Sequence, residues 1–126
     1  MNQGQTKKAG LYFRKAYNAS VKLNGEVFEM NVILLNDLGT LCYDQGKLDK
    51  ALLYFKKAEE IGQHFPDMEH LSTIYINLGR IYLKQGMLKE AEQNCVEGMK
   101  NAKRHDYDEG IKAAEICIAE IKSAMK

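Results

Sequence analysis

The sequence predicts an all-α fold made of stacked helix pairs, and three observations lead to that class. Residues 35–58 return 40 positions later as residues 75–98, with small and large side chains at matching places. A glycine divides each copy, Gly46 in the first and Gly86 in the second. Apolar residues recur at spacings of three and four on both sides of these glycines, which is the period of an amphipathic helix. Each copy is therefore predicted to be a helix, a turn and a second helix.

The matched positions are those at which two antiparallel helices would meet. Small residues there allow the backbones to approach each other closely. A large side chain at Ala51 or Ala91 would overpack this contact and cost on the order of 1–3 kcal/mol. The pairs that match at the common offset are Leu38 and Leu78, Gly39 and Gly79, Gly46 and Gly86, and Ala51 and Ala91.

The order of these residues resembles that of the tetratricopeptide repeat. In that family a large residue, Leu, a small residue and an aromatic on the first helix are followed by Ala, Phe and a small residue on the second. The resemblance implies a right-handed superhelix in which the first helix of each pair lines a concave groove for protein partners. The first copy supplies Leu35, Leu38, Gly39, Cys42, Ala51, Phe55 and Ala58, and the second supplies Tyr75, Leu78, Gly79, Tyr82, Ala91, Cys95 and Gly98.

The flanking segments extend the repeat in both directions. Ala9, Phe13 and Ala16 reproduce the pattern of the second helix at an offset of 42, so they are expected to belong to a repeat whose first helix is missing. The whole chain, 1–126, is then expected to be a single domain of about six antiparallel helices. Its predicted parts are a truncated repeat at 7–23, full repeats at 26–62 and 67–104, and a capping helix at 107–126.

The spacing of 40 to 42 is longer than the usual repeat of about 34 residues. Long repeats of this kind are similar to those of the kinesin light chains and, in overall sequence, to the C-terminal region of a mitochondrial member of the family. The second resemblance implies a factor on the matrix side of the mitochondrial inner membrane. It implies assembly and maintenance of respiratory-chain complex III, and hence electron transport, through the Rieske subunit. The first implies a cytoplasmic cargo adaptor that binds peptides in its groove.

The first two helices are expected on either side of Gly25. The first is predicted from residue 7 to about residue 22, after a polar stretch at residues 1–6 that is expected to fray. Gly25 then ends the helical pattern. The second is predicted at about 26–45, and its apolar surface is broader than one stripe. That breadth is typical of a helix held between two neighbours.

The remaining helices are separated by a proline and a short turn. The third helix is expected to end near Gly62, and Pro66 or Asp67 to begin the fourth, which runs to Gln85. The fifth is predicted to end at about Arg104. The last has one apolar and one charged face, as the end of a helical stack requires.

Composition and charge limit the classes of partner. The 126 residues are 45% hydrophobic and 28% charged with a net charge of +1, which gives no electrostatic reason to favour nucleic acid or an anionic membrane. No stretch approaches the roughly 20 apolar residues of a membrane span, and no cleavable N-terminal signal is visible. Because the chain starts within a repeat, further sequence is expected upstream, where a transit peptide or membrane segment would lie.

Cysteine and histidine give no sign of a metal or catalytic site. Three cysteines, Cys42, Cys95 and Cys117, lie far apart at helical packing positions, so all three are expected to be reduced. The sequence has no Gly-rich phosphate loop, Gly-x-Ser-x-Gly elbow or His-Glu-x-x-His pair. The chain is therefore expected to be non-enzymatic, with no metal and no cofactor. The three histidines are scattered, at His64, His70 and His105.

Binding in the concave groove is the favoured function. Asn77 matches the groove Asn that holds a peptide backbone in related proteins, and Asp37 takes its place in the first copy. Ile33, Asn36 and Thr40 stand where cationic residues would clamp a C-terminal carboxylate, so a receptor for chaperone tails is disfavoured. A plain solvated surface remains the alternative. The predicted groove residues are Asn36, Asp37, Thr40, Tyr43 and Asp44 in the first copy and Thr73, Asn77, Arg80 and Lys84 in the second, with Ile33, Ile76 and Leu83 beside them.

The first helix offers a second candidate surface. Tyr12, Phe13 and Tyr17 would pack on the missing helix of the truncated repeat. An open apolar patch of about 300–600 Å² is the upper range for a monomer. The sequence therefore predicts a homodimer, or exchange of helices, through this face.

Overall fold

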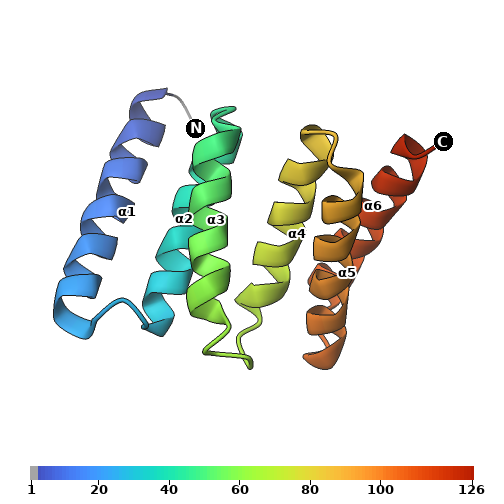
Figure 1. The fold of residues 1–126 in the computed structure, drawn as a ribbon. Helices are drawn as coiled ribbons and strands as arrows, with labels where there is room; N and C mark the ends of the chain where they lie inside the picture. Colours follow the sequence, from blue (N-terminus) through green and yellow to red (C-terminus); the bar gives the residue numbers. More distant parts are fainter. Residues whose placement is uncertain (1–2) are drawn as a thin grey trace. The chain divides into compact units, whose positions relative to one another are not determined.

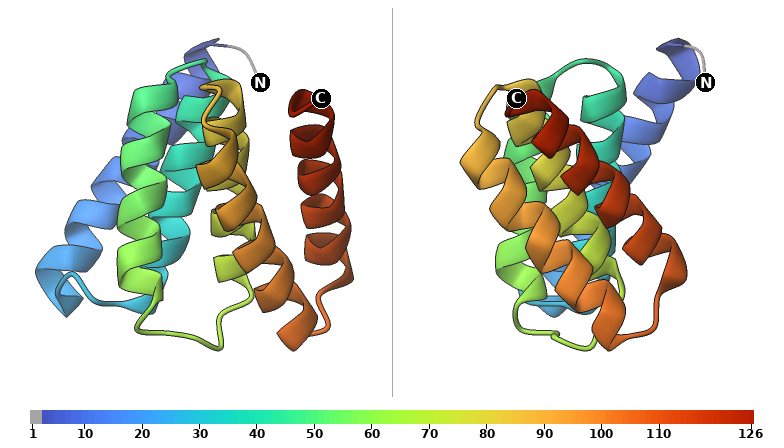
Figure 2. Two further views of the ribbon diagram at one scale, coloured as in Figure 1. Left: turned by 45° about the vertical axis from the view of Figure 1, so that its right-hand side comes forward. Right: turned by 90° about the vertical axis from the view of Figure 1, so that its right-hand side faces the viewer.

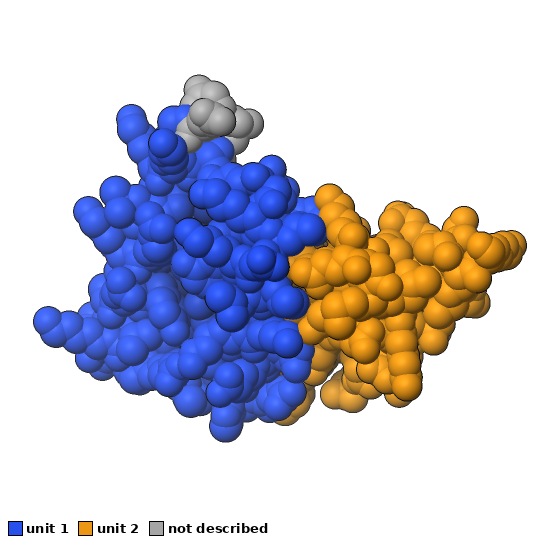
Figure 3. Space-filling view, turned by 45° about the horizontal axis from the view of Figure 1, so that its top comes forward, with its two compact units in different colours: residues 1–65 blue, residues 66–126 orange. Residues whose placement is uncertain are grey.

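The computed structural model describes residues 3–126, which form six α-helices and, within that range, no strand (Figure 1). The all-α class is confirmed. The chain divides into two compact units, residues 1–65 and residues 66–126, which are coloured separately in Figure 3. Each unit contains three helices, and the single domain predicted from the sequence stays a prediction.

The first unit contains α1 (Gln3–Asn24), α2 (Glu29–Asp44) and α3 (Leu48–Gly62). The middle helix, α2, lies between the other two and packs on both of them (Figures 1 and 2). Within the described part of this unit the backbones of α1 and α3 do not approach each other. The unit is therefore an open layer with α2 as its floor.

The contact between α2 and α3 depends on one glycine and one aromatic ring. A Cβ placed on Gly39 would lie 2.6 Å from Cε1 of Phe55, which is closer than real Cβ contacts. Phe55 is 1% exposed, and Ala51 and Ala58 on the same helix are fully buried. Small side chains at the repeat positions thus allow the close helix pair that the sequence predicts. Gly46, with φ of +78°, makes the turn between the two helices.

The second unit contains α4 (His70–Lys84), α5 (Leu88–Arg104) and α6 (Asp108–Ala124). Here each helix packs on both of the others. Gly98 on α5 allows a close approach to α4, because an added Cβ would lie 2.8 Å from Cγ1 of Ile76 and 3.1 Å from the carbonyl oxygen of Ser72. Three helices that all touch enclose a core shared by α4 and α6. The buried residues whose contacts place them among these helices include Ser72 and Ile76 of α4, Cys95 and Ala102 of α5, and Cys117 of α6.

Helix α1 begins earlier than the sequence predicts, and α2 begins later. Residues 3–6 are helical, whereas residues 1 and 2 of the predicted frayed stretch lie outside the described range. The start of α2 moves from residue 26 to Glu29 because Gly25 adopts φ of +82° and the connection is held by Asn31. The buried Asn31 side chain donates through Nδ2 to the carbonyl oxygens of Gly25 and Glu26, at 3.0 and 2.8 Å.

The prediction that Pro66 or Asp67 begins the fourth helix is wrong by several residues. Helix α4 begins at His70, and residues 66–69 form turns instead. Met68 within this stretch is only 6% exposed. The connection is therefore partly buried before the helix begins, and the turn takes residues that the sequence pattern assigned to the helix.

The expectation that all three cysteines are reduced is wrong for two of them. A disulfide joins Cys95 on α5 to Cys117 on α6, with the Cα atoms 6.3 Å apart, and Cys42 remains free and half-buried. The two helices are antiparallel neighbours joined by a turn at Asp106, which has φ of +52°. Cys95 and Cys117 are equally distant from that turn along the chain, so they come to the same level on facing helices.

Candidate functional site

The predicted groove residues of the first copy share one side of α2. Asn36, Asp37 and Tyr43 are half-buried, and Thr40 and Asp44 are exposed. Thr40 donates through Oγ1 to the carbonyl oxygen of Asn36 at 2.9 Å, so its hydroxyl is held against its own helix. None of the five belongs to the core. The structure therefore brings these residues together as a polar face on α2.

Helix α4 carries the corresponding residues of the second copy. Thr73, Asn77 and Arg80 are half-buried, and Lys84 is exposed. Thr73 also lines a small hollow of about 60 Å³ together with Glu69, His70 and Tyr107 of the same unit.

One residue placed beside this face by the sequence is not part of it. The repeat pattern puts Ile76 next to the groove residues, but Ile76 is 2% exposed and packs against Gly98 of α5. The missing side chain at Gly98 provides the space that buries Ile76. The polar faces of α2 and α4 belong to different units, and their combination into one groove stays a prediction.

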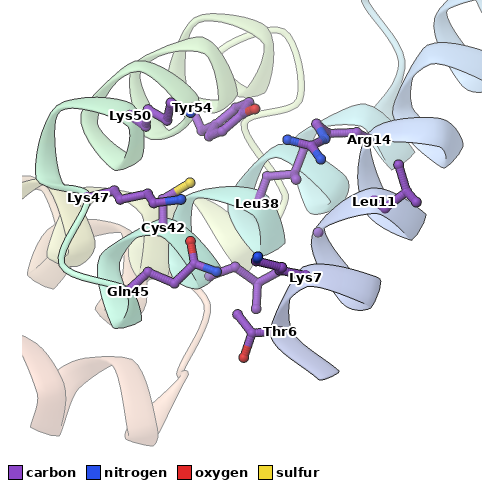
Figure 4. Close-up of a pocket in the computed structure, with 12 residues that line it drawn as sticks. Thr6, Lys7, Leu11, Arg14, Leu38, Cys42, Gln45, Lys47, Lys50 and Tyr54 are labelled. Carbon is purple, nitrogen blue, oxygen red and sulfur yellow. The ribbon is translucent and has the colours of Figure 1, made fainter. Parts of the chain in front are cut away.

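The first unit also holds a pocket that the sequence pattern does not predict. It has a volume of about 390 Å³ and lies between α1 and α3, with α2 beneath it (Figure 4). Four of its lining side chains are cationic, and none is a carboxylate. The residues that line it are Thr6, Lys7, Gly10, Leu11 and Arg14 of α1, Leu38, Leu41, Cys42 and Gln45 around the end of α2, and Lys47, Lys50 and Tyr54 around α3.

The cationic groups of the pocket act on the free thiol at its floor. Burial raises the pKa of Cys42, and the positive charges of Lys50, Lys47 and Arg14 oppose that rise. In Figure 4 the Cys42 and Lys47 side chains lie at one end of the pocket, and Arg14 reaches toward it from α1. The hollow thus joins a weakly polar thiol to a strongly positive rim.

A second cluster of charged groups lies at the other end of α1. Glu26 forms an ion pair with Lys57 of α3, and this bond raises the pKa of Lys57. Burial, and after it the carboxylate of Glu26, raises the pKa of Tyr17. Both partners of the ion pair are well exposed, so it is expected to contribute little to stability.

The face of α1 that is predicted to form a homodimer is partly open. Tyr12 is 68% exposed, whereas Phe13 and Tyr17 are half-buried. The rings of Tyr12 and Phe13 meet edge to face, with centroids 5.7 Å apart. The homodimer stays a prediction.

The histidines and acidic residues do not form a recognisable reactive centre within the described chain. Among residues 3–126 there is no group of three or more His, Cys, Asp or Glu side chains that could hold a metal ion. Nε2 of His105 lies 3.4 Å from the carbonyl oxygen of Pro66, so this histidine joins two turns of its own unit. No helix of the described range is long and apolar enough to cross a membrane.

Comparison with known protein families gives a match over the middle of the chain. Residues 29–104, more than half of the sequence, match the family model described as Tetratricopeptide repeat. This range begins at the first residue of α2 and ends at the last residue of α5. It therefore covers both full repeats.

Curated relatives match nearly the whole chain. One is the tetratricopeptide repeat protein 19 homolog, mitochondrial, of Drosophila melanogaster, 27% identical over 125 residues, or 99% of this chain and 34% of that protein. Another is the human tetratricopeptide repeat protein 19, mitochondrial, 25% identical over 121 residues, or 96% of this chain and 30% of that protein. The chain thus spans about a third of the length of the curated relatives that it matches.

A solved structure is similar in fold. The crystal structure of BtubC (BKLC) from P. vanneervenii matches with a TM-score of 0.72 over 97% of this chain and 57% of that one. The two sequences are 16% identical, so the likeness concerns the fold alone.

Proposed function

This chain belongs to the tetratricopeptide repeat family of protein-interaction scaffolds, and we propose that it holds a protein partner through the polar faces of α2 and α4. The observation that supports this is the division of each helix into two sides. On α4, Leu78 and Ile81 are buried, while Asn77 and Arg80, each one position before them, stay partly accessible. An amide and a guanidinium at this spacing can bind the backbone and a carboxylate of an extended peptide.

We further propose that the partner is respiratory complex III, bound through its Rieske subunit at the inner mitochondrial membrane, on the matrix side. Support comes from the resemblance to mitochondrial members of the family, including relatives that are named mitochondrial. The alternative is a cytoplasmic adaptor similar to the kinesin light chains, which would bind a cargo peptide on the same faces.

Direct binding to purified complex III tests the partner. The wild-type chain is immobilised and compared with the double variant Asn77→Ala with Arg80→Ala. The expected result is binding by the wild type and a loss of about tenfold or more in affinity for the variant, since two side chains that touch the partner are truncated. A matched control is Lys89→Ala with Gln93→Ala, a cation and an amide at exposed positions of α5.

The outcomes separate the alternatives. If complex III binds wild type and both variants equally, the site lies elsewhere on the chain. If complex III does not bind at all and a kinesin cargo peptide does so in an Asn77-dependent manner, the partner is wrong and the binding faces are right.

The side of the membrane has a test of its own. Disulfides persist in oxidising compartments and are rare in reducing ones. The reducing matrix would have to open the disulfide that joins Cys95 to Cys117 in the structure. On the matrix side the two cysteines are therefore expected to be recovered as thiols when intact mitochondria are treated with a membrane-permeant thiol reagent before lysis. Recovery of the pair as the disulfide would instead favour an oxidising compartment.

A further inference from the structure

The cationic pocket of the first unit lies on a different side of α2 from the predicted groove. The pocket takes Leu38, Leu41, Cys42 and Gln45 from the end of α2, and none of these is a groove residue. Its other walls come from α1 and α3, whose backbones do not approach each other within the described unit. The pocket is therefore a separate surface, and its role does not depend on the proposed function of the groove.

Comparison of the two repeats shows what opens the pocket. Cys42 stands 40 positions before Tyr82, at the place where the repeat calls for an aromatic residue. In the second unit Tyr82 fills this place and is only 9% exposed. In the first unit the position holds a small thiol, and Gly10 on the facing helix adds no side chain, its nearest possible contact being Leu41 at 4.0 Å. Two small residues thus leave a hollow where the second copy has a ring.

The same comparison shows what charges the pocket. Lys47 and Lys50 at the start of α3 correspond to Met87 and Glu90 in the second copy, so two cations replace an apolar residue and an acid. The α1 wall adds Lys7 and Arg14. Helix α1 carries five basic residues and no acidic one over its 22 residues. The positive charge of the pocket therefore comes from the first repeat and its neighbouring helix.

The charge of the pocket is not balanced by the protein itself. Among residues 3–126, no ion pair joins Lys7, Arg14, Lys47 or Lys50 to a carboxylate. The acids next in sequence, at positions 44 and 49, do not line the pocket. The N-terminus of α3 also lies here, and the helix dipole adds to the positive potential. Like charges gathered around one hollow repel one another, and an anionic occupant would relieve that repulsion.

We propose that this pocket docks an acidic segment of a partner protein, with two or more carboxylates on the four cations and an apolar side chain on the floor. The floor and one wall are apolar, at Leu38, Leu41 and Leu11, which suits a peptide that alternates acidic and aliphatic residues. The walls of the pocket come from two helices, α1 and α3, with side chains of α2 between them (Figure 4). A volume of about 390 Å³ is within the range of small ligand sites.

Two variants that copy features of the second repeat test the site in independent ways. Cys42→Tyr restores the aromatic residue and fills the hollow without changing its charge. Lys47→Met with Lys50→Glu copies the charges of the second copy and leaves the hollow open. The matched control is Lys15→Met with Lys22→Glu, which makes the same change of charge at exposed positions of α1 outside the pocket.

The probe is a fluorescein-labelled, end-capped peptide of sequence Glu-Glu-Leu-Glu-Glu, and binding is followed by fluorescence anisotropy. Wild type and the control are expected to bind it with equal affinity, and each pocket variant about tenfold or more weaker. The peptide Gln-Gln-Leu-Gln-Gln should not bind. The groove variant Asn77→Ala with Arg80→Ala should bind as wild type does, so failure of the groove proposal and failure of this one are distinguishable.

Protection of the Cys42 thiol provides a second measurement. Within the described chain Cys42 is the one free cysteine, so its alkylation by N-ethylmaleimide is followed by mass spectrometry. Saturating acidic peptide should slow the reaction, and the glutamine peptide should not. Far-ultraviolet circular dichroism and thermal unfolding verify that both pocket variants fold.

Three results would overturn the proposal. The first is equal peptide binding by wild type and both folded pocket variants. The second is competition by inorganic phosphate at concentrations similar to those of the peptide, which would make the pocket a small-anion site. The third is strong binding to vesicles of phosphatidylserine, lost in the pocket variants, with no binding of the peptide; that result would assign the basic helix to a membrane surface.

Discussion

The two units are each built from three helices, but they bury those helices to different extents. In the second unit, α6 packs on both α4 and α5 and buries Gly110, Ala114, Cys117 and Ile121. In the first unit, α1 packs on α2 alone, and no residue of α1 from 4 to 24 is buried. A third helix that touches both neighbours closes a core, whereas one that touches a single neighbour leaves a furrow. The pocket is the consequence of that difference.

One repeat position illustrates how the same pattern serves both arrangements. Phe55 in the first unit and Cys95 in the second stand at the same place of the repeat. A Cβ added to Gly39 would meet Phe55, and a Cβ added to Gly79 would meet Cys95. In the open unit a large ring fills the space between two helices. In the closed unit the smaller sulfur suffices, because α6 covers it and Cys117 bonds to it.

The largest expected effect follows from this dependence on a single ring. Phe55→Ala should destabilise the first unit by about 3–5 kcal/mol, since it removes a fully buried aromatic side chain and leaves a cavity that α1 cannot close. Urea unfolding measures the loss. Leu53→Ala on the same helix, at a position 70% exposed, is the control and should change stability by less than about 0.5 kcal/mol. A small effect of Phe55→Ala would mean that the open unit can repack, and the contrast between the units would be weaker than the structure indicates.

Two glycine substitutions, one in each unit, are expected to change the stability of the units in opposite directions. Gly98→Ala should destabilise the second unit by about 1–3 kcal/mol, because the new methyl group meets Ile76 and a backbone oxygen that cannot move aside. Gly10→Ala in α1 should stabilise the first unit by about 0.5–1 kcal/mol, because alanine favours a helix interior and nothing lies closer than 4.0 Å.

Native-state hydrogen exchange assigns each change to its unit. Amides of α4 to α6 should lose protection in Gly98→Ala, and amides of α1 should gain it in Gly10→Ala. The two stability changes need not be equal in size. A destabilising effect of Gly10→Ala would show that α1 packs more tightly than an open layer allows.

The repeat itself can be predicted from the sequence because its positions are local. Spacing alone assigns Gly39, Ala51 and Ala91 to helix contacts, and the two alanines are fully buried. Spacing misplaces Ile76 because its burial depends on the absent side chain of Gly98 on another helix. The spacing of apolar residues within one helix does not show where a neighbouring helix lacks a side chain.

The disulfide and the pocket cannot be predicted for a related reason. Cys95 and Cys117 meet because their distances from the turn at Asp106 are equal, a signal that is visible in the sequence only once the turn is known. The pocket requires that α1 and α3 stay apart, which no repeat pattern specifies. Its one sequence signal is the departure of Cys42 from the aromatic residue of the repeat.

The smallest expected effect concerns the thiol that remains in the open unit. Burial raises the pKa of Cys42 more than Lys50, Lys47 and Arg14 lower it, so the folded chain holds less thiolate than the unfolded chain at any pH near the ordinary thiol pKa. Alkylation by iodoacetamide should therefore be slower in the native state. The increase of its rate with pH should occur at higher pH than in the chain unfolded by concentrated guanidinium. By linkage, the contribution of Cys42 to stability is full below the unfolded-state pKa and is lost as the pH rises through the folded-state pKa.

Removing the cations around Cys42 should shift the pH profile of its alkylation in a defined direction. Lys47→Met with Lys50→Glu removes two charges that favour the thiolate, so the alkylation profile should move further toward high pH. The exposed pair Lys15→Met with Lys22→Glu should leave the profile in place. A shift of the profile toward lower pH in the pocket variant would mean that opening of α1, rather than the charge around the thiol, controls access to Cys42. In that case the furrow between α1 and α3 would be transient, and its walls would not form a preformed site.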